Sequence, residues 1–461
     1  MTNPIKYILA IAFVISFSSC EKFLEVEPRA SVSDEVTIYD KGSAESALHG
    51  VYNGLADAGY YGMSFQSIGY LNGDNIQWTG SQSQIQEFIN HKVNPENATI
   101  STAWVAIYRT INRANNVIAK VPEVVDPLLT ETAKKQILGE AYFVRALAYF
   151  DLARTWGGVP IVTKPTKTPA DNIGITRSTI EQVYNQVLAD LDQAETLLPL
   201  PGNIAVGGSD RYRANRKTAF ALKARYYLYR NDWTKAEEYA DKIVADNGNY
   251  RLLKPFNSFF ANDARGTQES VFELFYNGTT EQNTHKNQWL PQNLGGTRQW
   301  APNNAFVALV TDPVTSGGRS TLVAKDNQNR WYGTLYYRPT PSDPSYIIRT
   351  AELYLIRAEA KAQQFDANPA KLAEAIADLN AVRDRAGLAP TSAVTKEQVL
   401  SAIENERRLE FAYEPHRWFD LVRTGRAKQV LNITEDFRLV MPIPAEQLLA
   451  DRALEQTLGY K

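Results

Sequence analysis

The sequence contains one cysteine, Cys20, in 461 residues. A lone cysteine can form no intramolecular disulfide, so the fold must hold together without this cross-link. Only four histidines occur, and none pairs with another at the short spacing typical of a transition-metal site. The sequence therefore predicts no disulfide scaffold, no cofactor and no metal centre, while loop carboxylates and carbonyl oxygens leave a structural calcium ion open.

The chain also lacks an excess of either charge. It has 49 Lys and Arg against 51 Asp and Glu, a formal net charge of -2 at pH 7. Without a basic field, we expect no nucleic-acid partner. No Gly-rich phosphate loop and no Gly-x-Ser-x-Gly elbow occurs. Beyond the N-terminus, no apolar run is long enough to cross a membrane.

The first 19 residues have the layout of a secretory signal peptide. A single lysine precedes a nearly unbroken apolar run at 7–17 (YILAIAFVISF), and two serines then lead into Cys20. The run is about half of the roughly 20 residues that a membrane-spanning helix needs. We expect lipid on Cys20, the alternative being an ordinary signal peptide with an incidental cysteine. Residues 20–40, acidic and interrupted by Pro28, predict an extended tether.

Apolar residues at steps of three and four dominate the rest of the chain and predict a mainly α-helical fold. Residues 217–247 are typical of two helices joined by a tight turn, with Ala224 and Ala236 where tetratricopeptide repeats place small residues. We expect tetratricopeptide-like helical pairs forming an α-α superhelix scaffold in one domain, residues 41–461. The expected helical segments are 102–121, 136–198, 217–247, 349–386 and 395–423.

Two long segments, 59–99 and 250–345, lack helical periodicity and are rich in Gly, Asn, Gln, Pro and aromatic residues. Segments of this length are usually functional loops or disorder, and their aromatic content favours packed loops. Tyr and Trp combine a flat apolar face with a polar tip, which suits a binding surface. We expect the ligand-binding face in these two segments.

Four motifs are spread over nearly the whole length. They are CEKFLE at 20–25, AYFVRALAYFDL with WGGVP at 141–160, ERRLEFA with HRWFDLVRTG at 406–425, and MPIP at 441–444. In these motifs the chain resembles the SusD/RagB-like outer-membrane lipoproteins. The resemblance implies a non-catalytic protein on the outer-membrane surface that captures oligosaccharides or polysaccharides and delivers them to a SusC-like TonB-dependent transporter. The alternatives are a surface-anchored glycan hydrolase, a protein-binding adaptor and a peptide-binding uptake lipoprotein.

Sugar binding needs aromatic platforms for pyranose rings and polar side chains for hydroxyl groups, and both irregular segments supply them. Each candidate lies outside a periodic helix, although core packing is the alternative for any large aromatic residue. The candidates are Tyr70, Asp74, Asn75, Trp78, Trp289, Arg298, Trp300, Trp331 and Tyr332. We assign the tryptophans on or next to helices to packing; these are Trp104, Trp156, Trp233 and Trp418.

The block at 406–425 is the most charged motif of the chain. Glu406 and Glu410 share a helix face, and Arg407 and Arg408 are at helical spacing to pair with Glu404 and Glu410. One hypothesis is a carboxylate pair for glycoside hydrolysis. The other, which we favour, is a partly buried ion-pair network that docks this helix, because buried charges usually occur in pairs.

Overall fold

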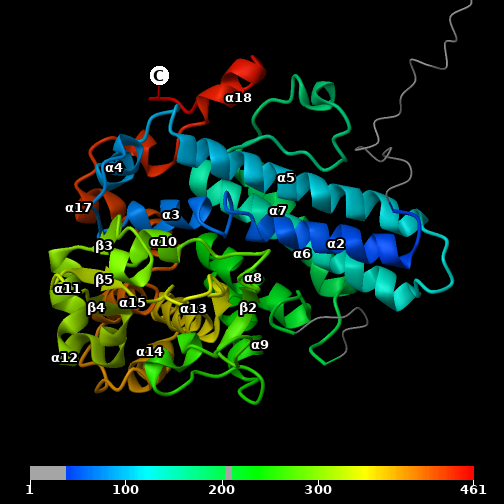
Figure 1. The fold of residues 1–461 in the computed structure, drawn as a ribbon. Helices are drawn as coiled ribbons and strands as arrows, with labels where there is room; N and C mark the ends of the chain where they lie inside the picture. The colour runs from blue at the N-terminus through cyan, green and yellow to red at the C-terminus, as the bar shows by residue number, and fades with distance from the viewer. Residues whose placement is uncertain (1–37, 203–209, 461) are drawn as a thin grey trace, which may run out of the picture.

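A computed structural model of the protein describes residues 38–202 and 210–460, most of which are helical (Figure 1). The expected signal peptide at 1–19, Cys20 and the tether up to residue 37 lie outside the described residues. No helix in the described part of the chain has the length and apolar character needed to cross a membrane. The predicted mainly α-helical fold class is confirmed.

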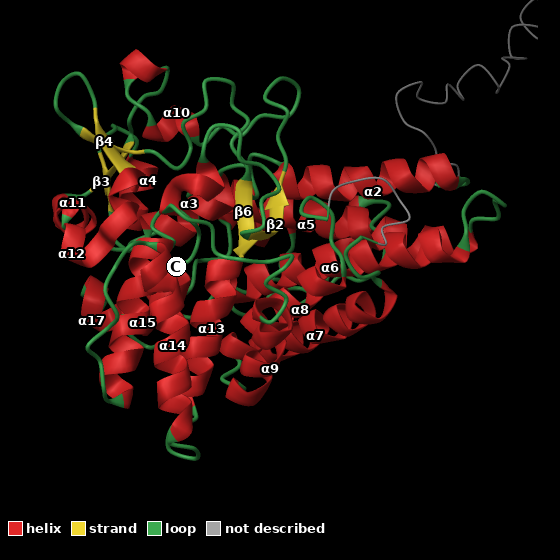
Figure 2. Ribbon diagram, turned by 90° about the horizontal axis from the view of Figure 1, so that it is seen from below, coloured by secondary structure: helices red, strands yellow, loops and turns green. Residues whose placement is uncertain are grey.

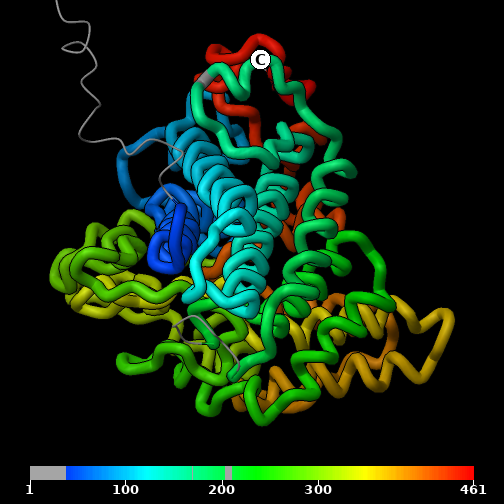
Figure 3. Tube along the Cα trace, turned by 90° about the vertical axis from the view of Figure 1, so that its right-hand side faces the viewer, coloured from blue at the N-terminus to red at the C-terminus, as the bar shows by residue number. Residues whose placement is uncertain are grey.

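Antiparallel helices follow one another through the first half of the scaffold. α2 and α6 both pack against α5, α7 lies against α6 and α8, and α9 packs on α8; Figure 3 shows the long helices side by side. Asn97, Thr130 and Asn215 start α5, α6 and α8 by accepting hydrogen bonds from amides of the first turn. The helices are α2 (Lys41–Ala56), α5 (Ala98–Lys120), α6 (Glu131–Trp156), α7 (Ile180–Leu197), α8 (Arg216–Tyr229) and α9 (Trp233–Val244).

The second half continues the same packing around one central helix. α13 contacts α9, α14 and α15, and α16 follows α15 and packs on α3. α13 is buried on two faces, because Leu353 and Ile356 belong to the large core while Leu355 and Ala358 belong to a smaller cluster with α14 and α15. The helices are α13 (Thr350–Gln363), α14 (Ala370–Arg385), α15 (Lys396–Glu410), α16 (Arg417–Arg423), α17 (Ala427–Leu431) and α18 (Ala445–Ala450).

The two irregular segments contain short elements that pair with each other. β1 pairs with β3, β4 with β5 and β2 with β6, all antiparallel. In Figure 2 the strands and many of the loops gather along one side, with the ends of α13 and α14 on the other. The elements are α3 (Ser64–Leu71), β1 (Ile76–Trp78), α4 (Ser83–Ile89), β2 (Ser270–Leu274), α10 (Lys286–Trp289), β3 (Trp300–Pro302), α11 (Asn304–Thr311), α12 (Pro313–Ser316), β4 (Val323–Lys325), β5 (Trp331–Gly333) and β6 (Ser345–Arg349).

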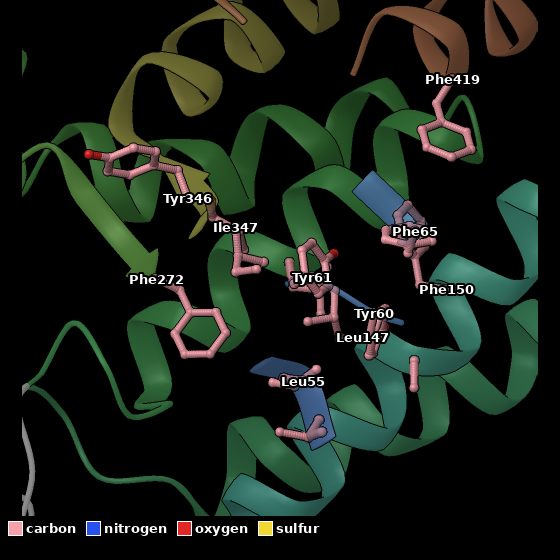
Figure 4. Packing of buried hydrophobic residues seen from close by; sticks show 14 of the residues in the cluster. Leu55, Tyr60, Tyr61, Phe65, Leu147, Phe150, Phe272, Tyr346, Ile347 and Phe419 are labelled. Atoms are coloured by element: carbon pink, nitrogen blue, oxygen red, sulfur yellow. The ribbon is translucent and has the colours of Figure 1, made fainter. Parts of the chain in front are cut away.

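A single large apolar core joins the scaffold to this side. Its buried members come from residues as far apart as Ile38 and Leu454. Figure 4 shows Tyr61 and Phe65 from the start of the chain close to Phe150 of α6, Ile347 of β6 and other buried residues. The irregular segments are therefore packed onto the helices, as their aromatic content predicts.

The closing segment returns to the first half of the chain. The amide of Met441 donates to the carbonyl oxygen of Thr155 at 2.7 Å, and Trp156 Nε1 donates to the carbonyl oxygen of Pro442 at 3.0 Å. The amide of Ala445 donates to the carbonyl oxygen of Pro95 at 2.9 Å. These bonds hold the end of the chain against the C-terminus of α6 and the start of α5.

Candidate functional site

Strand pairing brings the two irregular segments together at β1. Trp78 of β1 lies opposite Trp300 of β3. One residue further on, the amide of Thr79 donates to the carbonyl oxygen of Gln299 at 2.9 Å. Arg298 then reaches β5, where its Nε donates to the carbonyl oxygen of Trp331 at 2.8 Å. Residues predicted separately in the two segments, Trp78, Arg298 and Trp331, are thus neighbours through these contacts.

An open groove of about 510 Å³ lies beside Trp78. The backbone of Gly80 lies so close to the indole that a Cβ atom there would force Trp78 to shift. Gln86 Nε2 donates to Asn90 Oδ1 at 3.0 Å across one turn of α4. The groove is lined by Trp78, Gly80, Ser81, Gln82, Ser83, Gln86, Glu87, Asn90, Lys92 and Asn94.

The chemistry of this groove suits sugar hydroxyl groups. Amide side chains both donate and accept hydrogen bonds, and an indole offers an apolar surface to a pyranose ring. Its one carboxylate, Glu87, is already engaged, because Glu87 Oε2 accepts from the amide of Asn94 at 3.1 Å and from Asn97 Nδ2 at 2.9 Å. The groove therefore has no free pair of carboxylates for glycoside hydrolysis.

A cationic rim lies next to this groove. Arg298 has a positive φ of 47° and is partly buried, and burial, followed by the nearby charge of Arg330, lowers its pKa. Lys325, opposite Trp331 in the β4–β5 pair, holds its Nζ 4.9 Å from the centroid of a Trp331 ring. Tyr332 is partly buried, and burial, followed by the charge of Asp326, raises its pKa. Arg298, Trp331 and Tyr332 thus share one edge of the β4–β5 pair.

Three other predicted platforms are part of the core. Tyr70, Trp289 and Trp300 are 1%, 1% and 3% exposed, and their ring centroids lie 5.5 to 5.7 Å apart. Their polar atoms have no hydrogen-bond partner among the described residues. Because no face of these rings is exposed, the three residues pack in the core and cannot stack on a sugar in this structure. Trp104, Trp156 and Trp418 are buried and Trp233 is partly buried, as predicted.

Asp74 and Asn75 are also not presented to a ligand. Asp74 accepts from Arg417 Nε at 2.6 Å, and Asn75 Oδ1 accepts from Arg408 Nε at 2.8 Å. Burial would raise the pKa of Asp74, but the bonds to Arg417 and the charges of Arg417 and Arg408 lower it. These two residues fix the loop before β1 to α15 and α16. They therefore position β1 and do not line the groove.

The charged block forms the buried network that we favoured. Glu410 Oε2 accepts from Arg319 Nε at 2.9 Å, and Glu410 Oε1 accepts from Arg349 Nη1 at 2.8 Å and from Arg385. Glu406 Oε1 accepts from Arg319 Nη2 at 2.6 Å. Burial would raise the pKa of Glu410, but the charges of Arg385, Arg319 and Arg349 lower it to about 2. Neither glutamate is exposed, which leaves the hydrolase hypothesis without its carboxylate pair.

The partners within this block differ from the prediction. Arg407 pairs with Asp420 at 2.7 Å, and Arg408 contacts Asp74 and Asn75 instead of Glu404 or Glu410. Helical spacing allows pairs within α15, but tertiary packing supplies partners from other elements. In residues 38–202 and 210–460, no group of three or more His, Cys, Asp or Glu side chains could hold a metal ion.

Sequence reasoning missed most of the groove lining. Gln82, Gln86 and Asn90 recur at steps of four, which would place them on one face of a helix. The apolar residues Ile85, Phe88 and Ile89 also follow helical spacing, but α4 has only 7 residues, so the pattern covers too few turns to predict a helix.

Comparisons with known proteins agree with this architecture. A family model described as "Starch-binding associating with outer membrane" matches residues 22–228, and a second model, the SusD family, matches residues 333–440. SusD-like protein P38 of Formosa agariphila is 29% identical, with 98% of this chain and 99% of that protein covered. The chain belongs to the SusD/RagB family. The family resemblance stated from the motifs is thereby confirmed.

Solved structures of the SusD superfamily share the fold. A superfamily protein from Bacteroides vulgatus matches with a TM-score of 0.79 at 21% identity, covering 91% of this chain and 99% of that one. A structure named a laminarin binding SusD-like protein matches with a TM-score of 0.78 at 23% identity, covering 92% and 100%. The starch-binding protein SusD of Bacteroides thetaiotaomicron is 22% identical over 59% of this chain and 51% of its own length.

Proposed function

We propose that this SusD-family chain is a non-catalytic glycan-binding lipoprotein that captures oligosaccharides and delivers them to a SusC-like TonB-dependent transporter. The observation that carries the proposal is the open groove beside Trp78, which combines a partly exposed indole with four amide side chains and no free carboxylate pair. Trp78, Arg298, Trp331 and Tyr332 are the residues that we keep in the proposed site.

Binding and cleavage can be tested in the same mixtures. Calorimetry of the mature protein against a panel of oligosaccharides should give binding without any new saccharide products in the sample. Trp78→Ala should weaken binding by about 1 kcal/mol or more, because the stacked indole surface is lost, with little change in thermal stability. Trp233 is also partly buried but begins α9 and does not line the groove, so Trp233→Ala controls for the loss of an indole.

Three results would contradict the proposal. Cleaved sugar would favour the glycan hydrolase. Absence of binding to every glycan would favour the adaptor or peptide-binding alternatives. A large loss of thermal stability in Trp78→Ala, with unchanged affinity, would assign Trp78 to the core and remove it from the site.

We further infer that lipid on Cys20 anchors the protein at the cell surface of the outer membrane. Support comes from the signal-like segment before this cysteine and from the family model for proteins associating with the outer membrane. Several acyl chains are sufficient for stable anchoring. Cys20→Ala should bind glycan normally in solution and be lost from the membrane fraction of expressing cells, and its retention there would contradict lipid anchoring at Cys20.

A further inference from the structure

Cations without a carboxylate partner gather at the proposed sugar site. Among the described residues, Arg298 donates only to the carbonyl oxygen of Trp331, and the one contact of the Lys325 ammonium is the Trp331 ring. Lys92, which lines the Trp78 groove, forms no ion pair within the described chain and is exposed. The nearby Asp326 is occupied, because its Oδ2 accepts from Arg330 Nε at 2.8 Å. Glu87, which lines the same groove as Lys92, accepts in the described chain only from neutral donors and keeps its negative charge, so the excess positive charge lies at Arg298 and Lys325.

Arg298 is held in a fixed position between the two tryptophans. Its carbonyl oxygen accepts from Thr79 Oγ1, one residue after Trp78, while its Nε is bonded to the backbone of Trp331. The positive φ of 47° turns the chain at this point. With Nε anchored, Nη1 and Nη2 have no protein acceptor in the described part of the chain. Such an oriented fork matches the two oxygen atoms of a carboxylate or a sulfate ester.

Partial burial makes the charge of the Arg298 guanidinium energetically unfavourable. The charge of Asp326 acts on Arg298, but its effect is smaller than those of burial and of the nearby Arg330. A charge partly withdrawn from water without an ion pair is unfavourable, and a neutral hydroxyl group compensates for it less well than an anion does. Lys325 adds positive charge beside Trp331, because its ammonium lies over the Trp331 ring and forms no ion pair within the described residues. A negatively charged ligand would relieve both the desolvation of Arg298 and the repulsion among these cations.

We propose that the site binds acidic glycans, with a sugar ring against Trp78 and a carboxylate or sulfate ester of the glycan on the Nη atoms of Arg298. The inference rests on the proposed glycan-binding function and narrows the ligands to one chemical class, the acidic glycans. Uronate residues and sulfated sugars present the same chemistry to a guanidinium, so both sources are included in the test.

Calorimetry with matched pairs of ligands tests this preference. The probes are oligogalacturonate with its carboxyl-reduced counterpart, and sulfated galactan oligosaccharides with their desulfated counterparts. At least one acidic member should bind about tenfold or more tightly than its neutral partner, as expected for charge-assisted hydrogen bonds. The difference should shrink between about 0.05 and 0.5 M salt, because these groups are partly exposed. The pair that shows the difference identifies the anionic group.

Variants of Arg298 separate charge from shape. Arg298→Gln should abolish the acidic preference, so that the acidic and neutral partners bind with similar affinity. Arg298→Lys should restore only part of the preference, since an ammonium keeps the charge but not the two-pronged geometry. Arg452 is exposed near the C-terminus and lines no part of the groove, so Arg452→Gln should behave like the wild type.

The outcomes distinguish this inference from the function on which it rests. Binding of neutral glycans that depends on Trp78, with no gain for any acidic partner, would overturn the inference and leave the proposed function in place. An acidic preference that survives in Arg298→Gln would overturn the assigned residue. Absence of binding to every probe would contradict both proposals.

Discussion

The polar tips of buried aromatic residues fall into two groups. Tyr60 and Tyr61 donate to Asp151 Oδ2 at 2.6 and 2.8 Å. Tyr413 Oη, by contrast, has no partner among the described residues, although its ring packs 4.6 Å from that of Trp289. Burial raises the pKa of Tyr413, consistent with a neutral hydroxyl group in apolar surroundings. The first group stabilises through hydrogen bonds, whereas the second contributes through ring packing alone.

Removing the two kinds of hydroxyl group should therefore have different effects. Tyr413→Phe should leave the free energy of unfolding unchanged or raise it by about 1 kcal/mol, since an unpaired buried donor is unfavourable. Tyr60→Phe should lower it by about 1 to 2 kcal/mol, because Asp151 loses a hydrogen bond. Urea denaturation at pH 7 measures both. A loss for Tyr413→Phe as large as that for Tyr60→Phe would show that Tyr413 has a partner.

His285 makes the stability of the folded chain depend on pH. Its ring is fully buried and stacks 4.5 Å from Tyr336, and burial lowers its pKa to about 3. Below about pH 6.5 the unfolded chain gains a proton that the folded chain does not bind until about pH 3. The contribution is thus fully present above pH 6.5 and is lost as the pH falls toward 3, by up to about 1.4 kcal/mol per pH unit.

Replacing this ring tests the pH dependence directly. His285→Phe should show a shallower loss of unfolding free energy than the wild type between pH 6.5 and about 4 in denaturant titrations. His49→Gln, on the exposed side of α2, is the matched control and should follow the wild-type profile. Parallel pH profiles for His285→Phe and the wild type would rule out the neutral buried imidazole.

The site illustrates what residue patterns predict and what they leave open. Trp78 and Trp300 share the same aromatic character in irregular segments, yet one lines the groove and the other is 3% exposed. The two residues are directly opposite in the β1–β3 pair, and the difference arises from the pairing of the Trp300 ring with Tyr70 and Trp289, while Trp78 lines the groove. No local pattern encodes such a pairing. The sequence therefore predicts aromatic residues in both irregular segments, but not which of their faces are exposed.

At the scale of elements, the sequence predicts helices correctly where the apolar pattern extends over many residues. α5, α6, α13 and α14 follow the expected ranges because each is at least 14 residues long and carries caps or an apolar stripe. α3 and α4 were expected as loops. α3 has 8 residues, all buried, and α4 has 7, so neither shows a contrast between two faces over more than about two turns.

The C-terminal turn of α15 depends on its buried ion pairs. Glu410→Gln should lower the free energy of unfolding by about 3 to 5 kcal/mol, because Arg319, Arg349 and Arg385 would lose a shared counter-charge in the core. Chemical denaturation at pH 7 measures the loss. The exposed pair of Lys428 with Asp436 provides the control, and Asp436→Asn should cost less than about 1 kcal/mol.

A similar small loss in both variants would contradict the role of this network. The pKa of Glu410, lowered to about 2, gives a second readout. Its contribution is present above the ordinary glutamate pKa of about 4.3 and is lost as the pH falls toward 2. Glu410→Gln should therefore reduce the acid sensitivity of stability in that range.

At the scale of the whole molecule, α13 connects the two apolar clusters. One of its faces packs into the large core and the other into the cluster with α14 and α15. The buried ion pairs of Glu410 also join elements, because Glu410 of α15 pairs with Arg319 of the second irregular segment and with Arg385 of α14. We therefore propose that residues 41–461 behave as one domain, as the sequence predicts.

One domain should unfold in one cooperative transition. Tryptophan fluorescence and far-UV circular dichroism should give coincident denaturation curves for the mature protein, and the calorimetric and van't Hoff enthalpies should agree. Separate transitions for the two probes would contradict a single domain, and proteolysis between the transitions would then locate the boundary.

The contact of residues 441 and 442 with the C-terminus of α6 means that α6 cannot complete its native contacts before this late segment has been made. Trp156 and Thr155 obtain their partners Pro442 and Met441 from a segment that follows them by 286 residues. A nascent chain would keep the end of α6 without these contacts until residues 441 and 442 emerge. Acquisition of the native state is thereby coupled to synthesis of the segment around residue 441, and a chain cut short before that residue would leave the end of α6 exposed to proteases and chaperones.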